Sequence, residues 1–73
     1  MIKSINYLEI GDVICPIDFP DNQAIIVRID YREIEIIWSD GSIGRIQERD
    51  LLDFNVTGKN YLNELKMFLG LIK

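Results

Sequence analysis

Two pairs of closely spaced carboxylates are the side chains of this sequence best suited to chemistry. Asp18 and Asp21 form one pair, and Asp50 and Asp53 form the other. Carboxylates at such spacing can shift each other's pKa and act as general acid and base, or they can ligate Ca²⁺ or Mg²⁺. Neither pair lies in the ligand pattern of a known metal-binding loop. We therefore expect solvated loop charges, with no catalytic residue and no metal site.

The other residue types that carry chemistry are scarce. The 73 residues include one cysteine, Cys15, and no histidine, which excludes zinc-finger sites, Cys–His pairs and Ser–His–Asp triads. Cys15 lies in an apolar segment, which favours a buried side chain over a reactive thiol. No glycine-rich loop is present that would cradle a phosphate. The sequence predicts a protein that is not an enzyme, with no cofactor and no evident small-molecule substrate.

Charge is unevenly distributed along the chain. The net charge is −4, but residues 9–53 hold eleven acidic and four basic side chains. An acidic body repels phosphates and disfavours nucleic-acid binding, so it is either a solubilising surface or a surface complementary to a basic protein. No apolar run approaches the roughly 20 residues that cross a bilayer, and the N-terminus lacks a signal-peptide core. We expect no membrane association and a cytoplasmic location.

The apolar pattern predicts five short strands between residues 11 and 55. Fourteen residues are Ile, whose β-branched side chain favours strands. The expected strands cover about 13–15, 23–31, 34–38, 42–47 and 52–55, with a single 3₁₀ turn at 48–51. Asp40-Gly41 is a strong hairpin signal. In the N-terminal arm, residues 1–10, the spacing of Ile2, Ile5 and Leu8 fits one helical turn.

The clearest strand also predicts its own orientation. Ile34, Ile36 and Trp38 share one face, and a slip of one residue would bury Glu35 at a cost of several kcal/mol. We expect this face to point inwards and Ile37 to point outwards or to lie under a helix. The other expected interior residues are Val13, Cys15, Ile25, Val27, Ile29 and Ile46.

The period of the pattern changes near the C-terminus. Residues 57–72 are expected to form an amphipathic helix, because apolar residues recur there at spacings of three and four. The main stripe consists of Tyr61, Leu62, Leu65, Phe68, Leu69 and Ile72. Met67 and Leu71 broaden it. This helix either caps an open end of the β-structure or offers its apolar face to a partner, and both can hold together.

The strand pattern resembles the Tudor group of SH3-like barrels. The resemblance rests on residues 11–15, 24–31, 34–38, 40–41 and 50–52, and the same skeleton occurs in KOW-type domains. It implies a single domain that is mainly β, a five-stranded SH3-like barrel over residues 11–55 with the C-terminal helix appended. Tudor-type readers bind methylated amines in an aromatic cage by cation–π attraction. Trp38 matches one cage position, but Ile25 or Ile26 and Asp40 stand at others.

Two functions remain open at this stage. The first is a protein-binding module whose partner is a basic protein or a second copy, and a phage or mobile-element inhibitor of a nucleic-acid enzyme is a special case. Its candidate binding residues are Phe19, Tyr31, Trp38, Asp40, Met67, Phe68 and Leu71. The second is an RNA-binding or single-stranded-DNA-binding domain in which Tyr31 and Trp38 stack on bases. That function requires a cluster of Arg28, Arg32, Arg45 and Arg49 rather than their pairing with nearby acids.

Overall fold

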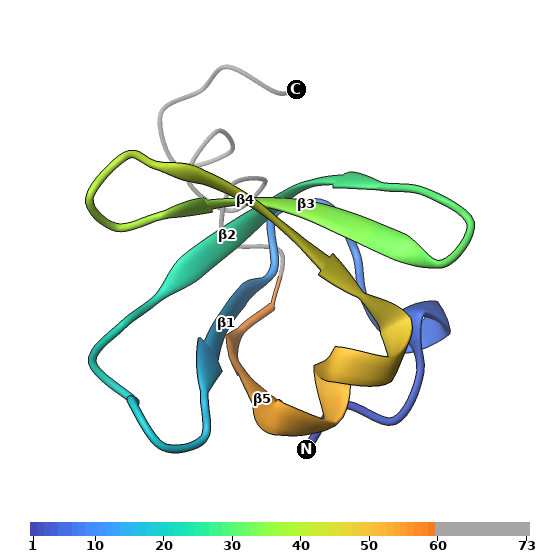
Figure 1. Ribbon diagram of the computed structural model, residues 1–73, viewed down its shortest axis with the longest axis horizontal. Coiled ribbons are helices and arrows are strands. Elements are labelled where there is room, and N and C mark those ends of the chain that lie inside the picture. Colours follow the sequence, from blue (N-terminus) through green and yellow to red (C-terminus); the bar gives the residue numbers. More distant parts are fainter. Residues whose placement is uncertain (60–73) are drawn as a thin grey trace.

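Residues 1–59 are described by the computed structural model, and they form one antiparallel sheet of five strands. The strand order is β4-β3-β2-β1-β5 (Figure 1). In chain order the elements are η1 (Ile5–Tyr7), β1 (Val13–Pro16), β2 (Ala24–Ile29), β3 (Glu33–Trp38), β4 (Ile43–Gln47), η2 (Glu48–Asp53) and β5 (Phe54–Gly58). The predictions of a mainly β fold, five strands and a 3₁₀ segment after the fourth strand are confirmed.

The predicted five-stranded barrel is confirmed as far as a five-stranded antiparallel sheet, but this sheet is not closed. Strands β4 and β5 are its edges, and within the described residues each pairs with a single neighbour. The 3₁₀ helix η2 connects these two edges in the chain and contributes Leu51, which is fully buried, to the core.

Only the first three residues of the predicted C-terminal helix, 57–59, lie within the described part of the chain. The structure assigns residues 57 and 58 to β5 rather than to a helix. The strand continues there because Val56 pairs with Ile14 and Gly58 with Val13, while Thr57 Oγ1 donates to the Val13 carbonyl oxygen at 3.3 Å. The remainder of that helix lies outside the described residues.

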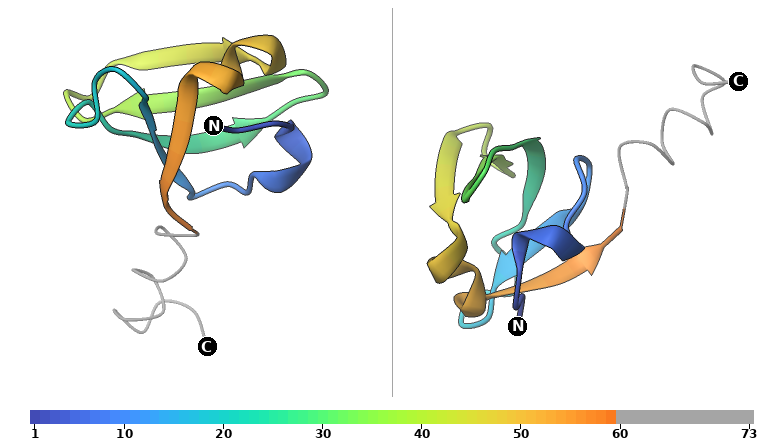
Figure 2. Two further views of the ribbon diagram at one scale, coloured as in Figure 1. Left: turned by 90° about the horizontal axis from the view of Figure 1, so that it is seen from below. Right: turned by 90° about the vertical axis from the view of Figure 1, so that its right-hand side faces the viewer.

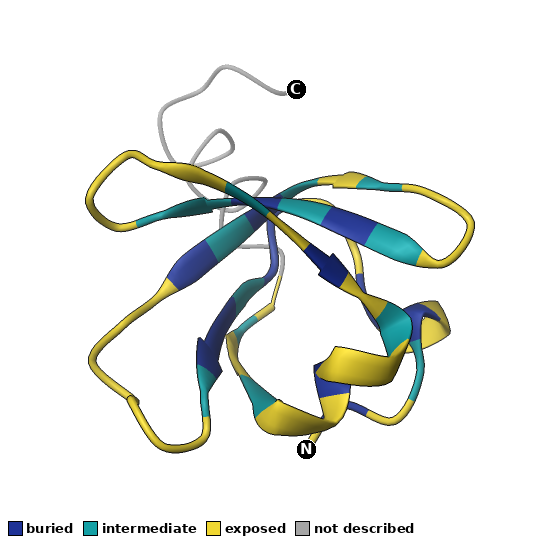
Figure 3. Cartoon of the chain, viewed as in Figure 1, coloured by how far each residue is buried: buried dark blue, intermediate teal, exposed yellow. Residues whose placement is uncertain are grey.

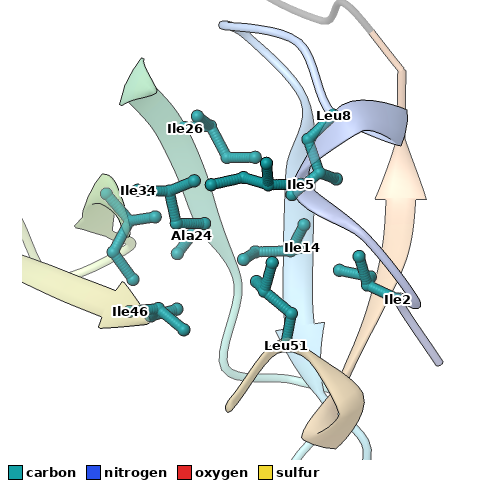
Figure 4. Close-up of a cluster of buried hydrophobic side chains, with 10 residues drawn as sticks. Ile2, Ile5, Leu8, Ile14, Ala24, Ile26, Ile34, Ile46 and Leu51 are labelled. Atoms are coloured by element: carbon teal, nitrogen blue, oxygen red, sulfur yellow. The ribbon is translucent and has the colours of Figure 1, made fainter. Parts of the chain in front are cut away.

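One hydrophobic core lies on the inner face of the sheet (Figure 4). Fully buried isoleucines of β1, β2 and β3 form its centre, namely Ile14, Ile26, Ile34 and Ile36. The N-terminal arm contributes Ile2, Ile5 and Leu8, all buried, to this core (Figure 4). The helical turn that their spacing predicts is confirmed as η1, whose first turn is capped by the Ser4 hydroxyl.

The inward face of β2 differs from the prediction. Ala24 and Ile26 are buried, whereas Ile25 and Val27 are half-buried on the other face or at the irregularity. Ile26 pairs with Ile36 and Arg28 pairs with Glu35, so Val27 is an extra residue in the ladder. A bulge of this kind reverses the alternation and returns Ile29 to the inner face, opposite Ile34.

The inward-facing residue at the start of β1 also differs from the prediction. Ile14, fully buried, takes the place in the core that we expected for Val13, which is half-buried. Cys15 is buried and free, as predicted. On β3 the orientation agrees with the prediction, because Ile34 and Ile36 are fully buried whereas Glu35 and Ile37 are half-buried. Buried and half-buried positions alternate along this strand (Figure 3). Across residues 1–59 no helix has the length and apolar character of a membrane span.

Asp12 is a charged side chain that is fully buried at the start of β1. Its Oδ2 accepts hydrogen bonds from the Glu9 amide at 2.8 Å and from Lys59 Nζ at 2.7 Å. Lys59 Nζ also donates to the Tyr7 carbonyl oxygen at 2.9 Å. The N-terminal arm, the start of β1 and the residue that follows β5 therefore meet at one carboxylate.

The bulge in β2 makes a prediction for two neighbouring residues. Ile26→Ala should lower the free energy of unfolding by about 3 kcal/mol, because it leaves a cavity in the core. Val27→Ala should lower it by about 1 kcal/mol, because Val27 is only half-buried. Urea denaturation followed by circular dichroism measures both values. The reverse order would show that β2 buries the face originally expected from the sequence.

Candidate binding surface

Two loops lie at the same end of the sheet, and we call residues 17–23 and 38–42 together the loop end (Figures 1 and 2). The first connects β1 to β2, and the second contains the turn between β3 and β4. The Ser39 amide donates to the Gln23 carbonyl oxygen at 2.9 Å, which joins the two segments. The loop end therefore contains three predicted site residues, Phe19, Trp38 and Asp40.

The β1–β2 loop holds an aromatic ring out in solvent. The Phe19 amide donates to the Pro16 carbonyl at 3.2 Å, and the Asn22 amide donates to the Phe19 carbonyl at 3.0 Å. These two successive turns fix the backbone while the Phe19 side chain stays 68% exposed. Asp18 and Asp21 flank the ring and line an open hollow of about 380 Å³ with it.

The predicted turn at Asp40-Gly41 is confirmed. The Gly41 amide donates to the Trp38 carbonyl at 2.8 Å, and Gly41 has a φ of +90°, a conformation that other residues adopt only with strain. The Asp40 carboxylate accepts hydrogen bonds from the Ser42 hydroxyl at 2.6 Å and the Ser42 amide at 2.8 Å. These bonds, the hydroxyl's first, lower the pKa of Asp40 below its ordinary value of 3.8, so Asp40 keeps its negative charge.

Trp38 combines packing with partial exposure. Its ring packs against the core, with its centroid 6.4 Å from that of Phe54. On β4, Gly44 leaves room for the indole, because a methyl group added there would lie 2.9 Å from Trp38 Nε1. Trp38 also lines a shallow, mainly apolar hollow of about 260 Å³ with Ile25 and Ile37. Trp38 is thus half-buried, because it packs against the core and also lines a surface hollow.

The loop end carries negative charge only. Asp18, Asp21 and Asp40 are all exposed, and residues 17–27 and 36–44 contain no lysine or arginine. The four arginines of the described chain lie on β2 and β4, in the loop between β2 and β3, and on η2. The loop end is therefore electronegative, and it carries the exposed Phe19 ring.

The opposite end of the sheet holds Tyr31, which is 81% exposed. The Arg32 guanidinium lies 5.3 Å from the centroid of the Tyr31 ring. Both residues line an open hollow of about 530 Å³ that also contains Arg49, together with the acidic residues Asp30, Glu33 and Glu48. Because Tyr31 precedes β3 and Trp38 ends it, the length of the strand, roughly 20 Å, separates the two rings. The structure does not bring them together.

The predicted arginine cluster is divided between ion pairs and this hollow. Arg28 lies 3.7 Å from the Asp30 carboxylate, and Arg45 lies 3.6 Å and 3.7 Å from those of Glu33 and Glu35. Two of the four arginines therefore face carboxylates on neighbouring positions. Met67, Phe68 and Leu71, the remaining predicted site residues, lie outside the described residues.

The structure places both carboxylate pairs on the surface. Asp18, Asp21, Asp50 and Asp53 are all exposed. Within residues 1–59, no three His, Cys, Asp or Glu side chains are placed to hold a metal ion. Sequence reasoning missed the pairing of Asp12 with Lys59, which are 47 positions apart, and no local pattern signals it.

No protein-family model, no curated protein and no solved structure matches this chain.

The contact between Trp38 and Gly44 predicts the effect of adding one methyl group. Gly44→Ala should lower the free energy of unfolding by about 1–3 kcal/mol and change the Trp38 fluorescence, because the indole must move. Gly58→Ala is the matched control, since its added methyl group would meet Val13 Cβ at an ordinary 3.5 Å. Equal losses of stability in the two variants would contradict the placement of Trp38.

The hydrogen bonds to Asp40 predict a pH dependence. Ser42→Ala removes the hydroxyl donor and should raise the pKa of Asp40 towards 3.8, which an NMR titration of the Asp40 carboxyl carbon measures. A lowered pKa stabilises the fold above the ordinary value, and this contribution disappears as the pH falls through the pKa of the folded state. The stabilities of wild type and variant should therefore differ near pH 6 and converge towards pH 2. An unchanged titration in the variant would refute the role of Ser42.

Proposed function

We propose that this chain is a small, non-catalytic SH3-like module of the Tudor or KOW type that binds a basic segment of a protein partner. The observation that carries the proposal is the loop end, where the exposed Phe19 ring lies among carboxylates and no basic side chain is present. Exposed aromatic residues are the usual anchors of protein interfaces. Surrounding charge of one sign steers a partner of the opposite sign.

The chemistry of the loop end indicates what the partner looks like. An apolar or aromatic side chain of the partner would pack on Phe19, and lysine or arginine side chains beside it would meet Asp18, Asp21 and Asp40. Asp40 is an exposed carboxylate that is ionised at physiological pH, and its hydrogen bonds from Ser42 lower its pKa further. Because exposed charge pairs each contribute little, the aromatic contact provides affinity and the carboxylates provide orientation and rate of association.

The order of the strands supports the SH3-like assignment. Four consecutive antiparallel strands, a 3₁₀ segment and a fifth strand returning beside β1 form the skeleton that the sequence resemblance implies. Trp38 stands at an aromatic position of the Tudor cage, but Ile25 is half-buried on the outer face and Asp40 replaces another ring. A complete cage is not formed by these residues, so the proposed ligand is an unmodified basic segment rather than a methylated amine.

An inhibitor of a nucleic-acid enzyme is a special case of the same proposal. Such enzymes bind phosphates in basic grooves, and an electronegative loop end presents carboxylates in place of phosphates. The small size and acidic balance of the chain fit this role, and a phage or mobile-element origin would agree with it. Cytoplasmic location belongs to this proposal as well.

Direct binding of single-stranded nucleic acid is the second candidate, and the Tyr31 hollow favours it. Tyr31 is an exposed stacking surface with Arg32 and Arg49 beside it. The acidic side chains in the same hollow weaken its attraction for phosphates. The proposed protein-binding function is therefore the better supported of the two.

A fluorescence-anisotropy titration with defined peptides tests the proposal. The probes are 12-residue peptides rich in lysine and arginine with one central leucine or phenylalanine, beside acidic peptides and a single-stranded oligonucleotide. The basic peptides should bind, and their affinity should fall as salt is raised. Phe19→Ala should weaken binding about tenfold, as expected for an interface anchor.

Two pairs of aspartates supply a matched control for charge. Asp18→Asn with Asp21→Asn should weaken binding of the basic peptides about fivefold, or about 1 kcal/mol for two exposed charges. Asp50→Asn with Asp53→Asn makes the same change of charge at the same spacing on η2 and should leave binding nearly unchanged. Equal effects of the two double variants would show that binding depends on the net charge of the chain and not on the loop end. Preferential binding of the oligonucleotide would favour the second candidate.

A further inference from the structure

An open hollow of about 600 Å³ lies between the N-terminal arm and β5, and we call it the arm hollow. Three of its lining side chains are large, apolar and exposed, since Met1 is 65%, Tyr7 72% and Val56 38% exposed. The buried residues Ile2 and Leu8 also line it. Exposed apolar side chains that gather in one place mark an interaction surface.

Backbone contacts fix the walls of the arm hollow at two points. The Ile2 amide donates to the Phe54 carbonyl oxygen at 3.1 Å and holds the arm beside β5 (Figure 2). Lys59 Nζ donates to the Tyr7 carbonyl oxygen at 2.9 Å, which joins the end of η1 to the residue after β5. The arm and β5 therefore form one surface rather than two independent segments.

The charge of the arm hollow is opposite to that of the loop end. Among the described residues that line it, Lys3 is the only charged one, and its side chain is exposed. The charge of Lys59 is offset by the Asp12 carboxylate at 2.7 Å. Residues 1–8 and 54–59 contain no aspartate or glutamate. The chain thus carries an acidic end with an exposed Phe19 ring and, on other elements, an apolar hollow with a positive charge.

We propose that the loop end of one copy of this chain binds the arm hollow of a second copy. The Phe19 ring would pack on the exposed apolar side chains of the hollow. Lys3 would meet the carboxylates of Asp18 and Asp21, which flank that ring. The two surfaces are therefore complementary in apolar character and in charge. This inference rests on the proposed function, because it names a second copy as the basic partner of the loop end.

The contact joins two different surfaces, so each copy offers one loop end and one arm hollow. Contacts of this heterologous kind extend into chains or close into rings. One aromatic ring and a few exposed charges form a small interface, which places its affinity at the weak end of specific contacts. Association is therefore expected at high protein concentration, and it should weaken as salt is raised.

Analytical ultracentrifugation of the untagged full chain tests the inference. The mean mass should be that of one chain near about 10 µM and should rise towards about 1 mM, as for a weak interface. Lys3→Glu and Phe19→Ala should each lower the association constant about tenfold. Arg49→Glu and Tyr31→Ala are the matched controls, because they make the equivalent changes at exposed positions of the opposite end of the sheet. Equal effects of the controls would overturn the proposal.

A mixture of the two site variants separates this contact from any other association. Lys3→Glu keeps its loop end and Phe19→Ala keeps its arm hollow, so an equimolar mixture should form pairs with the mass of two chains and no larger species. A mixture that associates no more than its components would contradict the proposal.

The basic peptides that test the proposed function distinguish the two ideas. They should disperse the self-associated chain, because both ligands use Phe19. If the wild-type chain keeps the mass of one chain at about 1 mM while these peptides still bind the loop end, this inference fails and the proposed function stands. Peptide binding that leaves self-association unchanged would also overturn the inference.

Discussion

The buried carboxylate of Asp12 is the constraint on which the arrangement of this small sheet depends. Removing a carboxylate from water costs several kcal/mol unless hydrogen bonds and an opposite charge compensate it. Compensation here comes from the Glu9 amide and from Lys59, which also binds the Tyr7 carbonyl. The backbone of Asp12 joins the same point to β2, because its carbonyl accepts from the Ile26 amide at 2.9 Å. An open sheet lacks the continuous ladder of a barrel, and this junction holds the arm, β1 and the exit from β5 together instead.

The two faces of the sheet differ in a way that follows from register. The inner face is uniformly apolar and is covered by the N-terminal arm and Leu51. The outer face places one apolar row beside one charged row, in which Glu35 lies between Arg28 and Arg45. The ion pairs of Arg28 with Asp30 and of Arg45 with Glu33 and Glu35 leave these two arginines poorly suited to bind phosphates. The strand that buries Ile34 and Ile36 thus also determines what the solvent side can bind.

The two ends of the sheet differ in their charges. Around Tyr31, acidic and basic side chains alternate and offset each other. At the loop end, the chain supplies carboxylates alone, and the backbone turns hold Phe19 outwards. Because the charges offset each other around Tyr31 but not at the loop end, we propose the loop end as the site of partner binding. Trp38 connects that end to the core, because its ring packs beside Phe54 while its edge remains accessible.

The sequence by itself determined the features that depend on neighbouring residues. The Asp40-Gly41 turn, the 3₁₀ segment after β4, the orientation of β3 and the burial of Cys15 all follow from local patterns. The tertiary structure decided the face of β2, because residues 24–27 are apolar on both sides and the bulge at Val27 changes the alternation that follows. It also decided that the sheet stays open, that Asp12 meets Lys59, and that Phe19 shares an end with Trp38 and Asp40 while Tyr31 does not. These outcomes depend on pairing between segments distant in the chain, and the period of a single strand carries no information about its partner.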